Sequence, residues 1–471
     1  MSTEHEAHEW NERAKEELTA GDPERAVEYA RRAHELARRN PIYLNTLGVA
    51  HAENGDMAQA LVFLRRAVKL KPDFVHGIVN LAKVLEKEDD RDAAQKAYEH
   101  AYQLSPSYPT LALALARIYR ERGEAGRART LLESAPDVDP QGLAIAAAAC
   151  TFDLEGEGAA IEQMRAVVDT HPEWKTARTS LGHLLLATGH WREGWRCYRD
   201  APPTDLPPDR IELRGEQGIG DVLFFLRFVP ALGRKVSLAC DRKLHSILKP
   251  GSLLEEIREP GGDGILIGDL PLLLGSADTP PAWPLEARAK ADLRQYGPPP
   301  YLGVTWRAGT DLGRRREYGN DPGVLMKAIP PALLGAALRG WPGTVVVLQR
   351  GARAGDLEKF ASSLKGTFRD LSALGDDLPE LLCVLAALDE YVGVSNANVH
   401  FLAGLGRTAR VLVPYPGEWR WMRRPGPSPW FPGFPVYRQP QNRDWSAPLA
   451  QLRADLLENR GQTPTTDSGL S

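Results

Sequence analysis

The sequence lacks the features that mark several large classes of protein. It has four cysteines in 471 residues, Cys150, Cys197, Cys240 and Cys383, and no CxxC pair. Neither a zinc knuckle nor a disulfide framework is therefore indicated, and a reducing compartment is favoured. The formal net charge is only −4, which argues against a nucleic-acid-binding protein because such proteins usually carry a strongly basic face.

Long apolar runs are also missing. The first twelve residues are polar and acidic, without the apolar segment of a signal peptide, and no uninterrupted apolar stretch reaches membrane-spanning length. We therefore expect a cytoplasmic protein without a membrane span. A chain of this length is expected to fold as two or three domains, each large enough to bury a core.

The first 200 residues repeat with a period of 34. Small residues recur in three columns, and a fourth column of turn residues contains three glycines. The columns are Ala14, Gly48, Ala82 and Ala116; Ala26, Ala60, Ala94 and Ala128; Ala33, Ala67, Ala101 and Ala135; and Gly21, Gly55, Asp89 and Gly123. Small residues at this spacing let paired helices pack closely, which is typical of tetratricopeptide repeats (TPRs).

Residues 1–200 therefore predict an all-α TPR superhelix of about six repeats, of which the fifth, near residues 150–171, departs from the period. The concave face of such an array usually holds an extended peptide or a partner protein, so we expect a protein partner there. A stiff, proline-rich connector runs from Ala201 to Pro208 and ends the array.

After the connector, short apolar runs alternate with helical segments, which predicts an α/β fold. A first Rossmann-like unit is expected over 207–296, with strands at 235–240 and 264–268 and a partly helical segment at 244–257. A second unit is expected over 297–460, because its apolar runs are nearly continuous in Val, Ile and Leu, as in strands buried on both faces. Those runs are 301–306, 344–349, 391–395 and 410–414.

Two such units facing each other across a hinge form the GT-B arrangement of many sugar transferases. Ligands of parallel sheets bind near the carboxyl ends of the strands. A polar tail, 461–471, is expected to be disordered.

A glycine loop opens the first unit. Gly215, Gly218 and Gly220 follow a short apolar run, and Asp221 begins a periodic apolar segment, so the pattern predicts a strand, a turn and a helix. Spacing alone favours Asp221 as a helix cap, since Asp is a preferred N-cap residue. A glycine loop by itself is weak evidence for a ligand.

Two runs resemble motifs of the heptosyltransferase-like enzymes, glycosyltransferase family 9. The run from Gly218 to Pro230 is similar to the Gly-Asp opening of that family. The run from Asp389 to Gly406 is similar to its Asp-Thr-x-x-x-His-Leu-Ala-Gly motif, with Ser395 in place of the aspartate. This resemblance implies that Asp221 is the general base that deprotonates the acceptor hydroxyl.

The resemblance also implies a site for a nucleotide-sugar donor on the second unit. Lys327 matches a basic residue that precedes an apolar-proline pair, and cationic groups and helix amides stabilise a departing diphosphate. The implied donor-binding residues are Thr305, Arg307, Lys327, Gln349, Ser395, Asn396, Ala397, Asn398 and His400, with Gly218 and Gly220 in the glycine loop. In the alternative interpretation, Ser395 or Asn396 only caps a helix and His400 is a buried histidine with satisfied contacts.

Two further segments allow more than one interpretation. Arg314, Arg315 and Arg316 are consecutive cations that either contact phosphate or lie in an exposed loop. The aromatic segment from Glu418 to Pro432 could stack on sugars, but we interpret it as packing against the sheet. Together with the repeats, it resembles a branch of bacterial TPR proteins with a heptosyltransferase-like tail.

These resemblances imply an inverting glycosyltransferase that transfers a sugar from a nucleotide-sugar to an acceptor held by the TPR array. The scheme requires no metal and no cofactor. Flagellin glycosyltransferases of some bacteria share this layout, which suggests flagellin as the acceptor. Two alternatives remain: a non-catalytic TPR scaffold with a degenerate transferase fold, and protein O-GlcNAc transfer of the repeat-fused kind.

Overall fold

The computed structural model describes residues 3–88, 90–136, 139–198, 206–207, 210–215, 218–308, 327–352, 355–415 and 417–458. The described residues form two compact units, which divide at Val167 and Val168. Asp89, the three consecutive arginines at 314–316, most of the connector and the tail at 461–471 lie outside the described residues.

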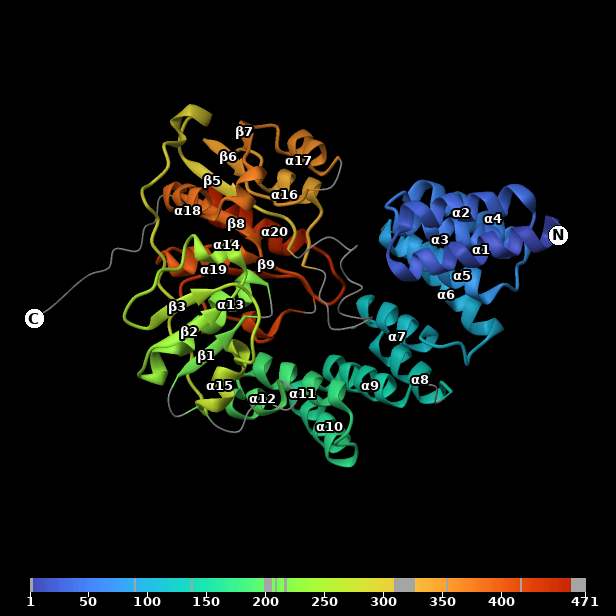
Figure 1. Cartoon of the computed structure of the whole chain (residues 1–471), viewed down its shortest axis with the longest axis horizontal. Helices are drawn as coiled ribbons and strands as arrows, with labels where there is room; N and C mark the ends of the chain where they lie inside the picture. The colour runs from blue at the N-terminus through green and yellow to red at the C-terminus, as the bar shows by residue number, and fades with distance from the viewer. Residues whose placement is uncertain are drawn as a thin grey trace, which may run out of the picture. The chain divides into compact units, whose positions relative to one another are not determined.

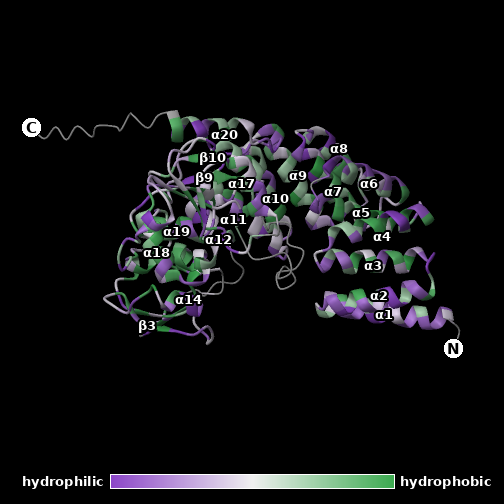
Figure 2. Cartoon of the chain, turned by 90° about the horizontal axis from the view of Figure 1, so that it is seen from above, coloured by the Kyte–Doolittle hydropathy of each residue, from purple (hydrophilic) through white to green (hydrophobic). Residues whose placement is uncertain are grey.

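The first unit consists of helices that pair in succession (Figure 1). They are α1 (Thr3–Ala20), α2 (Pro23–Leu36), α3 (Pro41–Glu53), α4 (Met57–Leu70), α5 (Val75–Lys87), α6 (Arg91–Leu104), α7 (Leu111–Glu121), α8 (Ala125–Ser134), α9 (Pro140–Glu155) and α10 (Glu157–Thr170), the last of which crosses the division. Figure 2 shows α1 largely in purple and white, as expected for a terminal repeat with a polar outer face.

The small-residue columns lie where these helices pack. Ala26, Ala60, Ala94 and Ala128 are all completely buried. A Cβ at Gly48 would lie 2.6 Å from Cγ of Leu64 on the paired helix, so the contact requires glycine. The turn glycines Gly21, Gly55 and Gly123 have φ values of 88°, 88° and 77°, a region that favours glycine. Ala135 differs from its column because α8 ends before it, and it is only half-buried.

Two further helices, α11 (Lys175–Thr188) and α12 (Trp191–Tyr198), form the pair predicted as the sixth repeat. They belong to the second unit, where Leu186, Ala187 and Trp195 join the core of the α/β part. The backbone amide of Arg423 also donates to the carbonyl of Ala187 at 3.0 Å. This helix pair therefore shares its core with the sheets that follow it.

The first sheet has four parallel strands in the order β3-β2-β1-β4. Its elements are β1 (Ile211–Arg214), α13 (Ile219–Phe225), the 3₁₀ helix η1 (Leu226–Leu232), β2 (Val236–Ala239), α14 (Arg242–His245), β3 (Leu254–Arg258), β4 (Ile265–Leu266), the 3₁₀ helix η2 (Ile267–Asp269) and α15 (Leu270–Leu273). The prediction of a partly helical 244–257 is wrong for its second half. α14 ends at His245, and β3 follows from Leu254 at the sheet edge.

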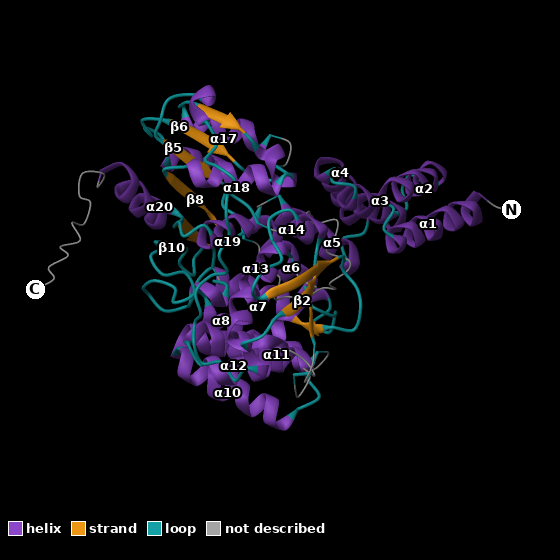
Figure 3. Ribbon diagram, turned by 60° about the vertical axis from the view of Figure 1, so that its left-hand side comes forward, coloured by secondary structure: helices purple, strands orange, loops and turns teal. Residues whose placement is uncertain are grey.

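The second sheet has six parallel strands in the order β10-β9-β8-β5-β6-β7. They are β5 (Tyr301–Val304), β6 (Thr344–Val347), β7 (Phe368–Asp370), β8 (Glu390–Val394), β9 (Arg410–Val413) and β10 (Val436–Arg438). The four strands predicted for this unit are confirmed. Figure 3 shows β5, β6 and β8 as neighbouring arrows with helices beside them.

Helices cover both faces of the second sheet. They are α16 (Pro331–Ala337), α17 (Asp356–Leu364), α18 (Leu378–Ala387), α19 (Ala397–Gly404) and α20 (Ser446–Arg453). Val345 and Val347 pack in the core with α16, α17 and α20, whereas Val346 and Leu348 pack in the core with α18 and α19. Because side chains alternate along a strand, one apolar run fills both cores. The smaller 3₁₀ helices are η3 (Leu293–Tyr296), η5 (Ser372–Asp376) and η6 (Trp419–Trp421), and a π-helical turn at Ala454–Glu458 extends α20.

Within the described parts of the chain, no helix combines the length and apolar character that a membrane crossing requires.

Candidate functional site

The glycine loop leads from β1 into α13, as predicted. Gly218 is the N-cap of α13, and the backbone amide of Asp221 donates to the carbonyl of Gly218 at 2.8 Å. Asp221 therefore lies in the first helical turn and is not the cap. Its carboxylate instead pairs with the guanidinium of Arg420, with Nη2 2.5 Å from Oδ1, and the Asp221 side chain is 34% exposed.

The helix after β1 lies against the helix after β8. A Cβ at Gly220 would be 3.1 Å from Cδ2 of His400 and 3.4 Å from Cα of Ala397. The ring of Phe224 also meets the His400 ring edge-on, with centroids 6.1 Å apart. Two segments that the sequence places far apart are thus neighbours, and this brings Asp221 close to the start of α19.

Asn396 is the N-cap of α19, as the capping alternative predicted. Its Oδ1 accepts a hydrogen bond from the amide of Asn398 at 3.0 Å, and its Nδ2 donates to Oγ1 of Thr305 at 2.7 Å. The Thr305 hydroxyl lies 2.7 Å from the hydroxyl of Tyr391. Thr305 and Asn398 are buried, so this network joins the ends of β5 and β8 through internal hydrogen bonds.

His400 is buried between aromatic rings, of which the Phe431 ring has its centroid 5.3 Å away. Burial, and then the positive charges of Arg420, Arg227 and Lys327, hold the pKa of His400 well below its ordinary value, although Glu418 opposes the shift. The imidazole is therefore neutral at pH 7.

Gln349 and Arg307 brace the loop that follows β5. Oε1 of Gln349 accepts hydrogen bonds from the amides of Trp306 and Arg307 at 2.9 and 2.8 Å, and its Nε2 donates to the carbonyl of Arg350 at 2.9 Å. The Arg307 guanidinium donates to the carbonyl of Gly351. Both side chains, predicted to bind the donor, are thus engaged in holding the backbone.

Lys327 reaches the site from the segment that pairs with 306–308. The amide of Ala308 donates to the carbonyl of Lys327, and the amide of Ile329 donates to the carbonyl of Trp306, both at 2.9 Å. The Lys327 ammonium lies 2.6 Å from Oε2 of Glu418, and the Lys327 side chain is 29% exposed.

Glu418 is the centre of the charge cluster. Its carboxylate pairs with Lys327 and Arg420, and Oε2 also accepts a hydrogen bond from the Ser395 hydroxyl at 3.0 Å. A carboxylate thus lies beside position 395, where the motif has an aspartate. It belongs to Glu418, which precedes η6, and not to the residue that follows β8. We define the charge cluster as Asp221, Lys327, Glu418 and Arg420.

Opposing effects set the protonation of the cluster. Burial alone would raise the pKa of Glu418, but the charges and hydrogen bonds of Lys327 and Arg420 hold it well below its ordinary value. Burial alone would lower the pKa of Arg420, but Asp221 and Glu418 raise it. Both residues are therefore charged at neutral pH.

Glu418, Arg420 and Arg227 were not predicted from the sequence. Arg227 is buried and donates to the carbonyls of Phe224 at 3.0 Å and Trp430 at 3.0 Å. Burial and the nearby Arg420 lower the pKa of Arg227 to about 9. A charged residue inside an apolar run, as in Phe-Phe-Leu-Arg-Phe-Val, is the signal that could have identified it.

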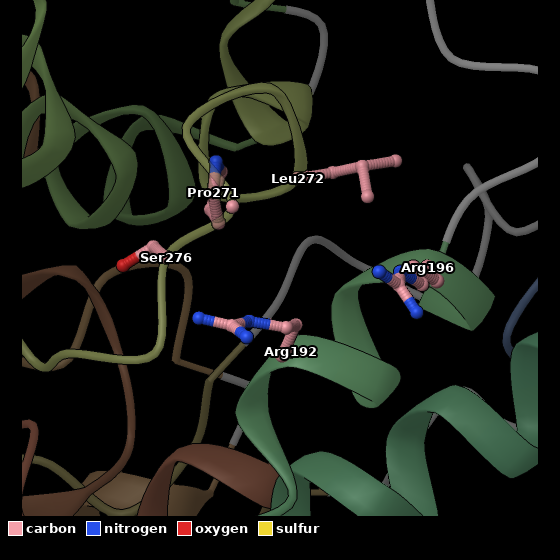
Figure 4. Close-up of a pocket in the computed structure, with 6 residues that line it drawn as sticks. Arg192, Arg196, Pro271, Leu272 and Ser276 are labelled. Carbon is pink, nitrogen blue, oxygen red and sulfur yellow. The ribbon is translucent and has the colours of Figure 1, made fainter.

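A separate pocket of about 230 Å³ lies between α12 and α15 (Figure 4). Arg192, Arg196, Pro271, Leu272, Gly275 and Ser276 line it, and none of these was predicted as a site residue. Among the described residues, no group of three or more His, Cys, Asp or Glu side chains is placed to hold a metal ion.

Sequence profiles of the tetratricopeptide repeat match residues 11–73 and 85–150. This part of the chain consists of TPRs. Most of the chain is similar to Protein FlbA of Caulobacter vibrioides, at 24% identity over 553 aligned residues that cover 95% of this chain and 89% of FlbA.

Three similar solved structures each cover a part of the chain. MamA 41-end from Desulfovibrio magneticus is 19% identical, with 36% of this chain and 96% of that chain covered and a TM-score of 0.32. A thermophilic TPR protein from Thermus thermophilus is 18% identical, with 38% and 99% covered and a TM-score of 0.31. The first TPR of Spaghetti, solved with an HSP90 peptide, is 17% identical, with 25% and 92% covered and a TM-score of 0.24.

Proposed function

We propose that the chain is an inverting glycosyltransferase that transfers a sugar from a nucleotide-sugar to a protein bound by its TPRs. In this proposal the two parallel sheets form a GT-B fold, and the enzyme acts in the cytoplasm. The observation that carries it is the proximity of Asp221, Lys327 and the start of α19 around one charge cluster. TPR arrays typically bind peptides or proteins, and flagellin is the acceptor that the layout suggests.

The charges of the cluster suit this chemistry. The Asp221 carboxylate is ion-paired with Arg420 and partly exposed, so an acceptor hydroxyl can reach it. The hydroxyl oxygen attacks the anomeric carbon and the bond to the diphosphate breaks, while the hydroxyl proton passes to the Asp221 carboxylate. The diphosphate leaves with its negative charge near Lys327. An ammonium has three N–H donors, so Lys327 can bind phosphate and Glu418 together.

A non-catalytic scaffold is the second candidate, and the internal pairing favours it. Asp221 and Lys327 both have protein partners, Asn396 caps α19, and Gln349 braces a loop. In such a protein these groups would stabilise the fold, and the TPRs alone would carry the function.

Nucleotide binding distinguishes these two candidates. The melting temperature of the full chain should rise with a nucleoside diphosphate or its sugar in a panel of uridine, guanosine, adenosine and cytidine forms, because a ligand that binds only the folded state stabilises it. Lys327→Ala should reduce that shift. If no member of the panel changes the melting temperature, the scaffold is the better description.

Turnover tests the proposed base. Asp221→Asn should slow transfer to the protein acceptor by about a hundred- to ten-thousandfold while leaving the donor-induced melting shift intact. Asp241→Asn is the matched control, because Asp241 caps α14 by accepting from the amide of Lys243 and Asn can do the same. Unchanged transfer by Asp221→Asn would remove Asp221 from the mechanism.

A further inference from the structure

The guanidinium of Arg420 connects two elements that are 199 residues apart in the sequence. Its Nη2 donates to Oδ1 of Asp221 at 2.5 Å, and its Nη1 donates to Glu418. The Arg420 and Glu418 side chains are buried, whereas Asp221 is partly exposed. One arginine therefore links a buried carboxylate to the carboxylate proposed as the base.

Several contacts fix Arg420 in place. Its Cζ lies 4.5 Å from the ring centroid of Phe224 and 4.6 Å from that of Trp419. Its backbone carbonyl accepts a hydrogen bond from the Ser428 hydroxyl at 2.5 Å. Aromatic contacts of this kind stabilise a cation and restrict its rotamers, so the orientation of the guanidinium is set before any ligand binds.

The pairing is more extensive than charge neutralisation of Arg420 requires. Glu418 already supplies one buried negative charge to Arg420, yet the guanidinium also reaches Oδ1 of Asp221. Among the hydrogen bonds and ion pairs of the described residues, the Asp221 side chain takes part through Oδ1. Holding one oxygen leaves the other available to accept a proton.

We propose that Arg420 is a positioning residue that orients the carboxylate of Asp221 for proton transfer, with Glu418 holding Arg420 in turn. This inference rests on the proposed function. Misplacing a reacting group by about 1 Å can slow a reaction about a hundredfold, so the position of Asp221 should appear in the rate.

The kinetic test uses Arg420→Lys in the full chain, with the nucleotide-sugar of the panel that gives the highest turnover. Lysine keeps the charge but cannot bridge two carboxylates as a fork. We expect kcat to fall about a hundredfold with the KM for the donor unchanged. In an Asp221→Asn background, the same substitution should have no further effect, because residues that act as a unit are not additive.

Arg438→Lys is the matched control. Arg438 is a half-buried arginine near the site that donates to the backbone carbonyls of Trp421 at 2.5 Å and Gly426 at 2.9 Å. The Arg438→Lys substitution should lower the melting temperature without a selective loss of kcat. If the losses from Arg420→Lys and Asp221→Asn multiply in the double variant, the positioning role is overturned.

Crystal structures provide a test that needs no turnover. The Asp221 carboxylate should move in Arg420→Lys and stay in place in Arg438→Lys. An unmoved Asp221 in Arg420→Lys overturns the inference. A moved Asp221 in a protein that turns over no donor supports the positioning and rejects only the proposed function.

Discussion

At the scale of single residues, Glu418 decides how four charges coexist, of which those of Glu418 and Arg420 are buried and those of Asp221 and Lys327 are partly exposed. Its carboxylate lies between Lys327 and Arg420 and accepts from Ser395. A buried ion pair is not necessarily a net gain over apolar packing, but removing one partner leaves the others uncompensated. The cluster therefore depends on this carboxylate more than on any exposed charge.

Glu418→Gln should destabilise the protein by about 3–5 kcal/mol at pH 7, because it removes the carboxylate that Lys327 shares with the buried Arg420, which keeps Asp221 as a partner. The pKa of Glu418 is depressed in the folded state, so its stabilisation is complete above the unfolded value of about 4.3 and is lost as the pH falls through the folded value. Denaturant unfolding at a series of pH values measures the free energies of unfolding of the unmodified protein and of Glu418→Gln. The difference between the two free energies should become smaller in acid.

Glu390→Gln is the control for this prediction. Glu390 pairs with Arg410 at 3.1 Å, and its side chain is 33% exposed. Its loss should cost only about 0–1 kcal/mol. A Glu418→Gln effect as small as this, or one that stays constant through acid pH, would contradict the view that Glu418 holds the cluster together.

The sequence identifies only some of the residues at the site. Asp221 and Lys327 stand out because each lies in a motif with a recognisable spacing. Glu418 and Arg420 do not, because they lie among tryptophans in a segment interpreted as packing. That interpretation is confirmed, since Trp419, Trp421 and Trp430 are buried. The pairing of Arg420 with Asp221 could not be predicted from the sequence, because the two residues are 199 positions apart and only the fold brings them together.

At the scale of elements, the close approach of α13 and α19 brings the two halves of the site together. The approach is close at Gly220, where a Cβ would lie 3.1 Å from Cδ2 of His400 and 3.4 Å from Cα of Ala397. Both neighbours belong to α19. The atom of Ala397 that the added Cβ would approach is a backbone atom, Cα. A side chain at position 220 therefore requires His400 or the backbone of α19 to shift by a few tenths of an ångström.

Gly220→Ala should destabilise the fold by about 1–3 kcal/mol, the usual range for an overpacked contact. Gly126→Ala is the control, because Gly126 lies inside α8 and a Cβ there meets nothing within 4 Å. It should leave stability unchanged or raise it by about 0.4–1 kcal/mol. The denaturant midpoints of the two variants measure both effects. Equal midpoints for the two variants would show that the contact at Gly220 is loose.

The strands differ in how well the sequence predicts them. β5, β6, β8 and β9 were predicted because they are interior strands of the second sheet, and their apolar residues face cores on both sides. β3, β7 and β10 were missed, and all three lie at sheet edges, whereas the remaining edge strand, β4, lies within the strand predicted at 264–268. Glu255 and Glu256 of β3 are exposed, which shows why: an edge strand has less need of apolar residues.

At the scale of the whole chain, the helix pair α11–α12 is predicted from the sequence as a sixth repeat, but it packs with the α/β part. Trp195 is buried against Phe225, Phe228 and Trp419, with ring centroids 6.2, 6.1 and 5.3 Å away. The 34-residue period predicts the two helices but not the core that they share with the sheets. The small residues that define the period allow close helix packing in every repeat and do not indicate what else a given repeat contacts.

Two truncations test this shared core. A fragment of residues 168–471 should be soluble and unfold cooperatively, whereas a fragment of residues 206–471 should expose the surface that Trp195 covers. An aromatic side chain of this size buries about 150–250 Å², so the shorter fragment should melt at a lower temperature. Circular dichroism during heating measures both, and equal melting temperatures would contradict a shared core.

The buried position of Trp195 also bears on how the chain can change in evolution. Duplication or deletion of a hairpin within α1–α8 would alter the reach of the array while conserving the contacts of the α/β core. The hairpin α11–α12 has no such freedom. Homologues should therefore vary in repeat number near the amino terminus and keep an aromatic residue at the equivalent of Trp195.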